Sequence, residues 1–404
     1  MSLLLLSLIG VIVFSLIMIL LLLTFAKSDE KIIRWSPLVV LLFVIILSSW
    51  WVKDLSLQWV LIEATTLFGA LLISLSKTEK SLDVAWKFLI INSFGLGIAF
   101  LGIIFLSFGT REDVNSQLTL FSLLPRIPTH ETLMVEAGIW LAVFGYTSKL
   151  GLFPNHFWVS DTYAESPSQI SSILAALLPV SVILAIYPFV VMDTHFTSNH
   201  FSAKSGMLIL GLITMMYSLW TVYQTDDLRR ITALTAMFHS GGLAVFVYLY
   251  PDFETINYML SANITVKTLL FSTMGILRVD AGARNFSEIN PENGLCRKSL
   301  YLYILSVAMA FVLPISPFFI SDLILIKLGM EGLHYWIIAV PIINLIFFLV
   351  VINKIIPLLK IKSRPLAEKN KKLLTTRINI SYILFFVTTL VGIFGMYKII
   401  IGEL

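Results

Sequence analysis

The sequence contains little charge and almost no cysteine. Charged residues make up 13% of its 404 positions, and Cys296 is the only cysteine. A single cysteine excludes a disulfide framework and any metal cluster held by several cysteines. The sequence also lacks the glycine-rich phosphate motifs of nucleotide-binding proteins, a serine nucleophile elbow and the spacing of zinc ligands. We therefore expect no cofactor or metal in this chain, no active site of its own and no nucleic-acid partner.

Long hydrophobic runs make up most of the sequence. Hydrophobic residues make up 58% of the chain, and the mean hydropathy is +0.91. Apolar runs of about 20 residues, the length of a helix that crosses a bilayer, recur along the chain. The alternating pattern of a membrane β-barrel is absent. The sequence therefore predicts an all-α polytopic membrane protein, and the first run, Leu3 to Phe25, is expected to be a retained anchor rather than a cleaved signal peptide.

About 12 transmembrane helices are expected. In chain order they are 2–25, 36–52, 56–76, 88–108, 133–160, 169–192, 205–222, 231–250, 256–277, 299–328, 335–357 and 378–401. Of the 28 lysines and arginines, 20 lie in the odd-numbered loops and five in the even-numbered ones. By the positive-inside rule the odd-numbered loops are cytoplasmic, and both termini face outward. The other three basic residues lie within spans, and only Lys398 is near enough to a helix end to reach the surface.

Two of the expected helices, 133–160 and 299–328, are too long for one crossing and carry proline near the middle. Pro154 lies in the first, and Pro314 and Pro317 lie in the second. Aligning them sets helices two to six against helices seven to eleven, with start-to-start offsets of 166 to 175 residues. Because five is an odd number, the second copy must be inverted, as in transporters with sites at mid-membrane. A coincidence of loop lengths is the alternative. The predicted organisation is an N-terminal helix and loop (1–35), a first five-helix repeat (36–192), an inverted second repeat (205–357), and a basic loop with a C-terminal helix (358–404).

Six ionisable side chains are expected at membrane depth and are predicted to translocate protons. They are Glu63, Lys149, His156, His239, Lys267 and Asp322. A buried charge costs several kcal/mol, so such groups pair with one another or line a hydrated path. Glu63 has no other charge within eight residues, and Lys149 is its expected partner, at salt-bridge or one-water distance.

The remaining members extend the series across the membrane. An imidazole such as His239 suits a relay between lysines because it titrates near neutral pH. Lys267 lies about mid-helix, with Asn263 one turn away and expected to hydrogen-bond it. Asp322 ends the series on one side. Packing alone is the alternative explanation of such a series, since one buried pair can simply fix the register of two helices.

Polar groups beside the two breaks are expected to support the path. Asn155 and Ser321 stand next to the broken segments. His156 has two interpretations that stay open. It is either a member of the proton path or a group that satisfies the backbone freed at Pro154.

Several stretches at these positions resemble a known family. "IEATTLFGALL" and "SLDVAWKFLIINSFGLGIAFLG" resemble the membrane subunit called component F of hydrogenase-4 and formate-hydrogenlyase-type complexes. That subunit belongs to the wider group of antiporter-like subunits of respiratory complex I and of multisubunit sodium/proton antiporters. "GYTSKLGLFPNHFWVSDTYAESPSQISSIL" is similar to the family's lysine-bearing broken helix, and "DLRRITALTAMFHSGG" to its histidine-bearing helix. "NITVKTLLF" and "SPFFISDLILI" are similar to the segments with its second central lysine and its final acid, so the resemblance covers about residues 36–360.

This resemblance implies about fourteen helices, translocation of protons or sodium, and partner subunits that carry the redox chemistry. The implied partners are other membrane subunits, the lipid bilayer and soluble nickel–iron or iron–sulfur subunits, and the implied location is a prokaryotic cell membrane. The sequence departs from the family where Val180 replaces a lysine or asparagine, where Asn263 replaces a histidine, and where Asp322 replaces glutamate. One helix also stands at the start, where about three are usual.

Three functions are compatible with the sequence. The first is a proton-translocating subunit of a hydrogenase-like or complex-I-like membrane complex, in which a neighbouring subunit shifts charge in the Glu63–Lys149 pair. The second is the proton-coupled module of a cation/proton antiporter or of an inorganic-carbon uptake system, without redox partners. The third is a scaffold subunit that does not conduct ions.

Overall fold

The computed structural model describes residues 2–25, 35–76, 79–109, 133–195, 202–249, 252–289, 296–362 and 371–402. These residues are almost wholly helical, with no β-strand among them beyond one isolated bridge. The α-helices are α1 (Leu3–Phe25), α3 (Ser36–Trp51), α4 (Leu55–Ile73), α5 (Glu79–Gly109), α7 (Leu133–Leu150), α8 (Phe157–Glu165), α9 (Ser168–Ala176), α10 (Leu178–His195), α11 (Ala203–Gln224), α12 (Leu228–Tyr248), α13 (Phe253–Ala281), α14 (Arg297–Phe311), α15 (Pro317–Glu331), α16 (Ala339–Ile355) and α17 (Lys371–Ile400). Short 3-10 turns are η1 (Ser74–Ser76), η3 (Phe286–Glu288), η4 (Tyr335–Ile338) and η5 (Ile356–Lys360). The all-α fold class is confirmed.

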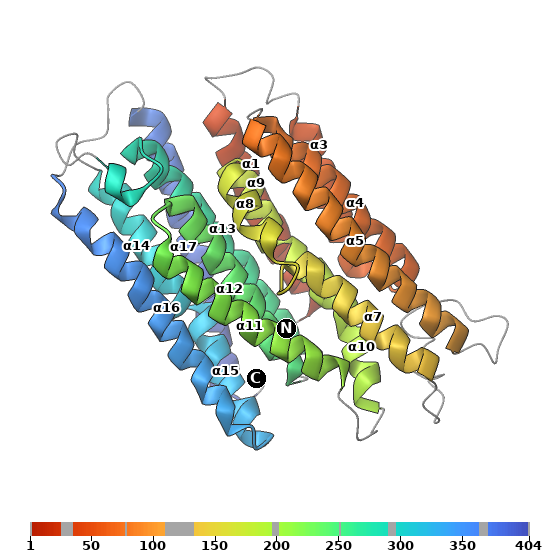
Figure 1. Cartoon of the computed structure of the whole chain (residues 1–404). Helices are drawn as coiled ribbons and strands as arrows, with labels where there is room; N and C mark the ends of the chain where they lie inside the picture. Colours follow the sequence, from red (N-terminus) through yellow and green to blue (C-terminus); the bar gives the residue numbers. More distant parts are fainter. Residues whose placement is uncertain are drawn as a thin grey trace.

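All twelve expected crossings have a counterpart in the described residues. Nine segments there are long and apolar enough to cross a membrane, counting α9 with α10 as one and α16 with its flanking turns as one. The shorter apolar helix α3 and the two broken helices, α7/α8 and α14/α15, supply the other three. The chain is therefore a polytopic membrane protein, and Figure 1 marks both chain ends on the same side of the bundle.

Two predicted starts are wrong by about two turns. Helix α5 begins at Glu79 rather than residue 88, and α17 begins at Lys371 rather than residue 378. An ion pair one turn apart, between Asp83 and Lys87 at 2.7 Å, stabilises the polar first turns of α5. Charged turns like these continue a helix beyond the apolar run from which its limits were predicted.

Both predicted helix breaks are present. In the first, α7 ends at Leu150, and Gly151 takes φ +73°, a backbone conformation that favours glycine. The Phe153 N–H, just before Pro154 in the break, donates to Thr214 Oγ1 of α11 at 2.8 Å. A polar side chain thus satisfies the backbone that the break frees, as lipid could not.

The second break lies between α14 and α15. It contains Pro314, while Pro317 is the first residue of α15 and so needs no N–H there. Ser316 caps this new helix by accepting from the Phe318 N–H at 3.1 Å.

A third interruption was not predicted. The expected helix 169–192 consists of α9 and α10, which separate at Leu177, just before Pro179. The Val180 N–H donates to the Leu177 carbonyl at 3.2 Å instead of to that of Ala176. The Ala176 carbonyl is taken up by Asn263 Nδ2 of α13 at 2.8 Å. A side chain of the second half of the chain therefore hydrogen-bonds the carbonyl that this interruption leaves free in the first half.

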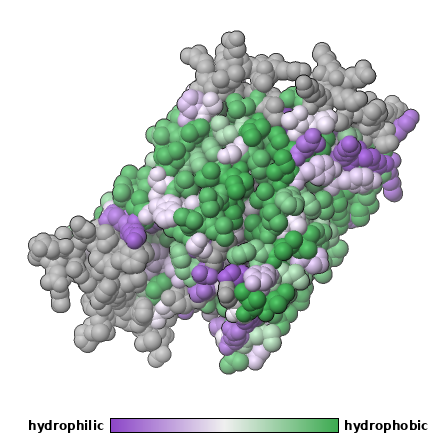
Figure 2. Space-filling model, turned by 180° about the vertical axis from the view of Figure 1, so that it is seen from behind, coloured by the Kyte–Doolittle hydropathy of each residue, from purple (hydrophilic) through white to green (hydrophobic). Residues whose placement is uncertain are grey.

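The central helices are α9, α10, α12 and α13, most of whose residues are buried. Figure 1 shows α3, α4 and α5 on one side of this centre and α14 to α17 on the other. No more than a third of the residues in the apolar outer spans α11, α16 and α17 are buried, as expected of surfaces that face lipid. Figure 2 shows hydrophobic residues across the middle of the back face, with hydrophilic ones gathered toward its ends.

Small residues bring α5 and α7 into close contact. A Cβ atom added to Gly145 of α7 would lie 2.3 Å from the Ala99 nitrogen of α5, and one added to Gly95 of α5 would lie 2.3 Å from the Ser148 Cβ. Only glycine permits this approach. The contact places the turn of α5 around Gly95 beside the end of α7.

That the two five-helix repeats superpose after inversion stays a prediction.

Candidate functional site

The first polar cluster joins α4, α5 and α7, and we call it the Glu63–Lys149 cluster. Lys149 is 2% exposed, and its Nζ donates to Thr66 Oγ1 at 2.7 Å. The same Nζ lies 4.9 Å from the ring centroid of Phe88, within reach of a cation–π interaction. Glu63, one turn before Thr66, accepts a hydrogen bond from Ser93 Oγ at 2.6 Å.

Of the two predicted arrangements of Glu63 and Lys149, salt-bridge or one-water distance, the direct salt bridge is not present. No ion pair within 4.0 Å joins the two described side chains, because Thr66 takes the ammonium and Ser93 takes one carboxylate oxygen. The second carboxylate oxygen, Oε2, is buried and has no hydrogen-bond partner within the described part of the chain. A bridging water between the two groups stays a prediction.

The second polar cluster lies between α12 and α13. Lys267 is 1% exposed, and its Nζ donates to Ser240 Oγ at 3.3 Å. Ser240 follows His239 in α12, so the hydroxyl that accepts from Lys267 is next to the histidine in the chain. The His239 ring stacks on Phe318 of α15 at 4.2 Å between centroids. Its ring nitrogens lie outside hydrogen-bonding geometry with every described group, although the Ala310 carbonyl is near.

A small cavity connects His239 to the second broken helix. The cavity measures about 20 Å³, room for about one water. Its lining includes His239, Ser321, Asp322 and Asn344. Asn344 Nδ2 of α16 donates to Asp322 Oδ2 at 2.7 Å, and the Ser321 hydroxyl donates to the Pro317 carbonyl at 2.8 Å. The structure thus brings together His239 and Asp322, which are 83 residues apart in the chain.

His156 and Asn155 lie in the first break, apart from both clusters. His156 Nδ1 is 3.1 Å from the Pro154 carbonyl, and its ring lies 4.1 Å from that of Tyr217 between centroids. Asn155 Nδ2 donates to Ser148 Oγ at 2.7 Å. These contacts favour the interpretation in which His156 satisfies freed backbone.

Asn263 does not hydrogen-bond Lys267 in this structure. Its amide nitrogen donates to the Ala176 carbonyl at the unpredicted interruption of α9/α10. The prediction rested on helical spacing alone, which cannot reveal a carbonyl freed on another helix.

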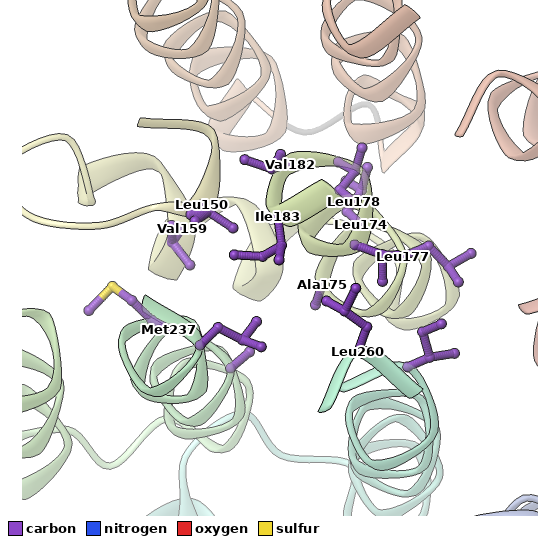
Figure 3. Close-up of a cluster of buried hydrophobic side chains, with 14 of the residues drawn as sticks. Leu150, Val159, Leu174, Ala175, Leu177, Leu178, Val182, Ile183, Met237 and Leu260 are labelled. Carbon is purple, nitrogen blue, oxygen red and sulfur yellow. The ribbon is translucent and has the colours of Figure 1, made fainter. Parts of the chain in front are cut away.

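Buried apolar side chains of α7 to α10 pack against those of α12 and α13. Figure 3 shows Leu150 and Val159 facing Met237 of α12, and Ala175 and Leu177 near Leu260 of α13. Val180, where the family usually has a polar residue, is fully buried in the same core.

The neutral partners of the charged groups were not predicted from the sequence. These are Thr66, Ser93, Ser240 and Asn344. Each is a polar residue within an apolar helix, and Thr66 and Ser240 are three residues and one residue from a predicted site residue. That spacing is a usable but weak indicator, because hydroxyl side chains are common in membrane helices.

Comparison with known proteins identifies the family. The profile described as "NADH:quinone oxidoreductase/Mrp antiporter, TM" matches residues 52–349, about three-quarters of the chain. The chain belongs to this family. The match includes all six predicted ionisable site residues and both broken helices.

Individual relatives are distant. The hydrogenase-4 component F homolog of Methylacidiphilum infernorum is 28% identical over 194 residues, which are 47% of this chain and 40% of that protein. The NADH-quinone oxidoreductase subunit N 2 of Opitutus terrae is 23% identical over 252 residues, 61% of this chain and 52% of the relative. The chain therefore spans about half the length of these relatives.

Solved members of membrane complexes have the same fold. A chain of the membrane-bound sulfane sulfur reductase, an archaeal respiratory membrane complex, matches with a TM-score of 0.77 at 16% identity, covering 97% of this chain and 79% of its own. A chain of the Mrp complex from Dietzia sp. DQ12-45-1b matches with a TM-score of 0.73 at 15% identity, covering 97% and 81%. Both likenesses show the architecture.

Among the described residues, no group of three or more His, Cys, Asp or Glu side chains is arranged to hold a metal ion.

Proposed function

We propose that this chain is a proton-translocating, antiporter-like subunit of a multisubunit membrane complex. The observation that carries the proposal is the choice of partner for each buried lysine. Lys149 and Lys267 bind hydroxyl groups, those of Thr66 and Ser240, rather than carboxylates. A hydroxyl accepts from an ammonium and can also donate to a neutral amine, so both protonation states of the lysine keep a hydrogen bond. A direct carboxylate partner would hold each lysine in its charged form.

The path that follows from this arrangement has two parts. In the first, a neighbouring subunit changes the charge in the Glu63–Lys149 cluster, and Lys149 gives up or takes a proton. In the second, protons pass between Lys267, His239 and Asp322, with one water in the cavity between the last two. Transfer between the two parts crosses the helices whose buried apolar side chains Figure 3 shows, and we expect water to enter there during each transfer.

The chemistry of the central groups favours protons over sodium. A sodium ion requires several oxygen ligands, as hard cations generally do. Two amines and an imidazole lie at the centre of the described site, and charged amines repel a cation. Carboxylate oxygens are present at both ends, in Glu63 and in Asp322, but no group of three or more His, Cys, Asp or Glu side chains among the described residues is arranged to hold a metal ion.

Partners and location follow from the family. The relatives are named as subunits of hydrogenase-type and quinone oxidoreductase enzymes, and the solved neighbours belong to multisubunit membrane complexes. We infer that this chain assembles with other membrane subunits and with soluble nickel–iron or iron–sulfur subunits, in a prokaryotic cell membrane with both termini outward. A stand-alone uptake module and a scaffold are not favoured by these likenesses. Copurification from native membranes identifies the partners, and recovery without redox subunits would contradict the inference.

Replacing Lys267 by Met tests the function directly. Met preserves most of the volume and apolar contact of the lysine stem, so assembly should be retained. We expect proton uptake into vesicles containing the complex to be abolished at equal amounts of assembled protein. Lys398→Met, in α17 near a helix end, is the matched control and should leave uptake intact. Undiminished uptake by Lys267→Met would remove the proton-path assignment and leave a structural function for the buried lysine.

A further inference from the structure

Lys267 uses only part of its hydrogen-bonding capacity. An ammonium has three donors, and a buried charged group normally uses all of them. The described residues give Lys267 one hydrogen bond, to Ser240 at 3.3 Å, which is long for a charged donor. Its side chain is 1% exposed, so bulk water does not supply the rest.

The other side of Lys267 faces α9, and two contacts fix how α9 and α13 align. At one end, Asn263 donates to the Ala176 carbonyl. At the other, a Cβ atom added to Gly275 would lie 2.5 Å from Ser168 Oγ. The two helices are therefore antiparallel, with residue 176 opposite 263 and residue 168 opposite 275.

The residues between these contacts must face each other as well. Ser172 is four residues from both Ser168 and Ala176, and Lys267 is four residues beyond Asn263. Positions four apart lie on one face of a helix. Ser172 therefore lies on the face of α9 that packs against α13, level with the turn that starts at Lys267. The next position on this face of α13, Phe271, contacts the Tyr163 ring of α8, at 5.6 Å between centroids.

Two acceptor atoms at this contact have no partner. Ser172 Oγ and Asn263 Oδ1 are buried and make no hydrogen bond with any described group. Buried polar atoms in folded proteins nearly always have a partner, so each orphan requires an explanation. The Asn263 amide cannot simply be reversed, because its nitrogen must face the Ala176 carbonyl. Its oxygen is therefore held as a free acceptor one turn from Lys267.

We propose that Ser172 and Asn263 form a second hydrogen-bonding position for the Lys267 ammonium, on the side of α13 that faces the first half of the chain. The proposal rests on the function proposed above and adds a path across the α9/α13 contact. In the first position the ammonium binds Ser240 beside His239, toward the cavity and Asp322. In the second it binds Ser172 and Asn263, at the interruption of α9/α10. A lysine that alternates between the two accepts a proton on one side and delivers it on the other, without a polar residue at Val180.

The test compares proton uptake by vesicles carrying the complete complex with Ser172→Ala, Ser172→Thr or Lys267→Met, at equal assembly and across a range of pH. We expect Ser172→Ala to lower uptake by roughly tenfold, the effect of one hydrogen bond to a charged group. Its pH profile should move toward lower pH, because the charged lysine has lost an acceptor. Ser172→Thr keeps the hydroxyl and should restore both the rate and the profile.

Ser181→Ala is the matched control. It makes the same change at a fully buried serine, whose hydroxyl bonds Ser49 and Trp50 instead of facing α13. Wild-type uptake and pH profile in Ser172→Ala, with Lys267→Met inactive, would overturn the second position and leave the proposed function standing. Equal losses in Ser172→Ala and Ser181→Ala, with no change of pH profile, would also overturn it. Full activity of Lys267→Met would instead overturn the proposed function itself.

Discussion

At the scale of single residues, the charged groups could be predicted from the sequence and their partners could not. A charge inside an apolar run is conspicuous, which is how Glu63, Lys149 and Lys267 were found. A threonine there is ambiguous, because its hydroxyl usually bonds a carbonyl of its own helix. Thr65 does so, donating to the Ile62 carbonyl at 2.6 Å, while the adjacent Thr66 receives Lys149. Only the reach of the Lys149 side chain from α7 to Thr66 in the folded bundle distinguishes the two.

These two threonines permit a matched test. Thr66→Val keeps the shape of the side chain and removes the acceptor of Lys149, so we expect proton uptake to fall by roughly tenfold. Thr65→Val makes the same change at a hydroxyl that bonds only its own helix, and uptake should stay near the wild-type rate. The measurement is uptake by vesicles at equal amounts of assembled complex. Equal rates for the two variants would show that the Thr66 hydroxyl does not serve Lys149.

At the scale of secondary structure, length and proline together predicted the breaks. Residues 133–160 and 299–328 were too long for one crossing, and both are interrupted as expected. The run 169–192 has the length of a single crossing, so its two prolines, Pro179 and Pro188, did not lead to a predicted break. What stabilises that interruption is Asn263, on a helix nearly ninety residues away. Sequence spacing within one helix carries no information about such a contact.

The close packing of α5 and α7 leads to a prediction about Gly145. A Cβ atom there would meet the backbone of α5 at 2.3 Å, so Gly145→Ala must push the two helices apart. We expect a loss of about 1 to 3 kcal/mol, as for other overpacked sites. Because Lys149 is one turn away, its bond to Thr66 should weaken and uptake should fall.

Gly97→Ala is the control for this change, since a Cβ atom added there meets nothing within 4 Å. Thermal unfolding in detergent reports the stability, and vesicle uptake reports the transport. A Gly145→Ala variant with the midpoint and uptake of Gly97→Ala would show that the helices can separate without cost.

At the scale of the whole molecule, an ionic cluster joins the two halves of the chain on the side that the charge pattern predicts to be cytoplasmic. Arg284, after α13, bonds Glu165 at the end of α8 at 2.6 Å, and also Asp227. Asp227 caps α12 by accepting from the Arg229 N–H at 2.8 Å. Burial alone would lower the pKa of Arg284, but its hydrogen bonds to Glu165 and Asp227 raise it. The guanidinium therefore stays charged and holds the end of the first broken helix against the start of the histidine-bearing helix.

Nothing in the sequence pattern predicted this cluster, because its members lie in three separate segments near span ends. Glu165, Asp227 and Arg284 are ordinary interfacial charges when taken singly. Their pairing depends on where α8 ends relative to α12, which is a property of the folded bundle. The inverted superposition of 36–192 on 205–357 likewise stays a prediction that rests on spacing.

Removing the shared cation should loosen the contact between the halves. Arg284→Gln leaves Glu165 and Asp227, whose side chains are 17% and 11% exposed, without their common partner. We expect a loss of roughly 2 kcal/mol, because partly buried charged groups lose hydrogen bonds. The loss should appear as a lower unfolding midpoint of the purified complex in detergent.

Arg230→Gln is the control. It removes an ion pair with Asp161 in which the two side chains are 45% and 31% exposed, and such a pair contributes only about 0 to 1 kcal/mol. High salt should narrow the difference between wild type and Arg230→Gln while leaving most of the Arg284→Gln deficit, because the more buried cluster is less screened. If both variants unfold at the same temperature as wild type, the contact between α8 and α12 must depend on apolar packing rather than on this cluster.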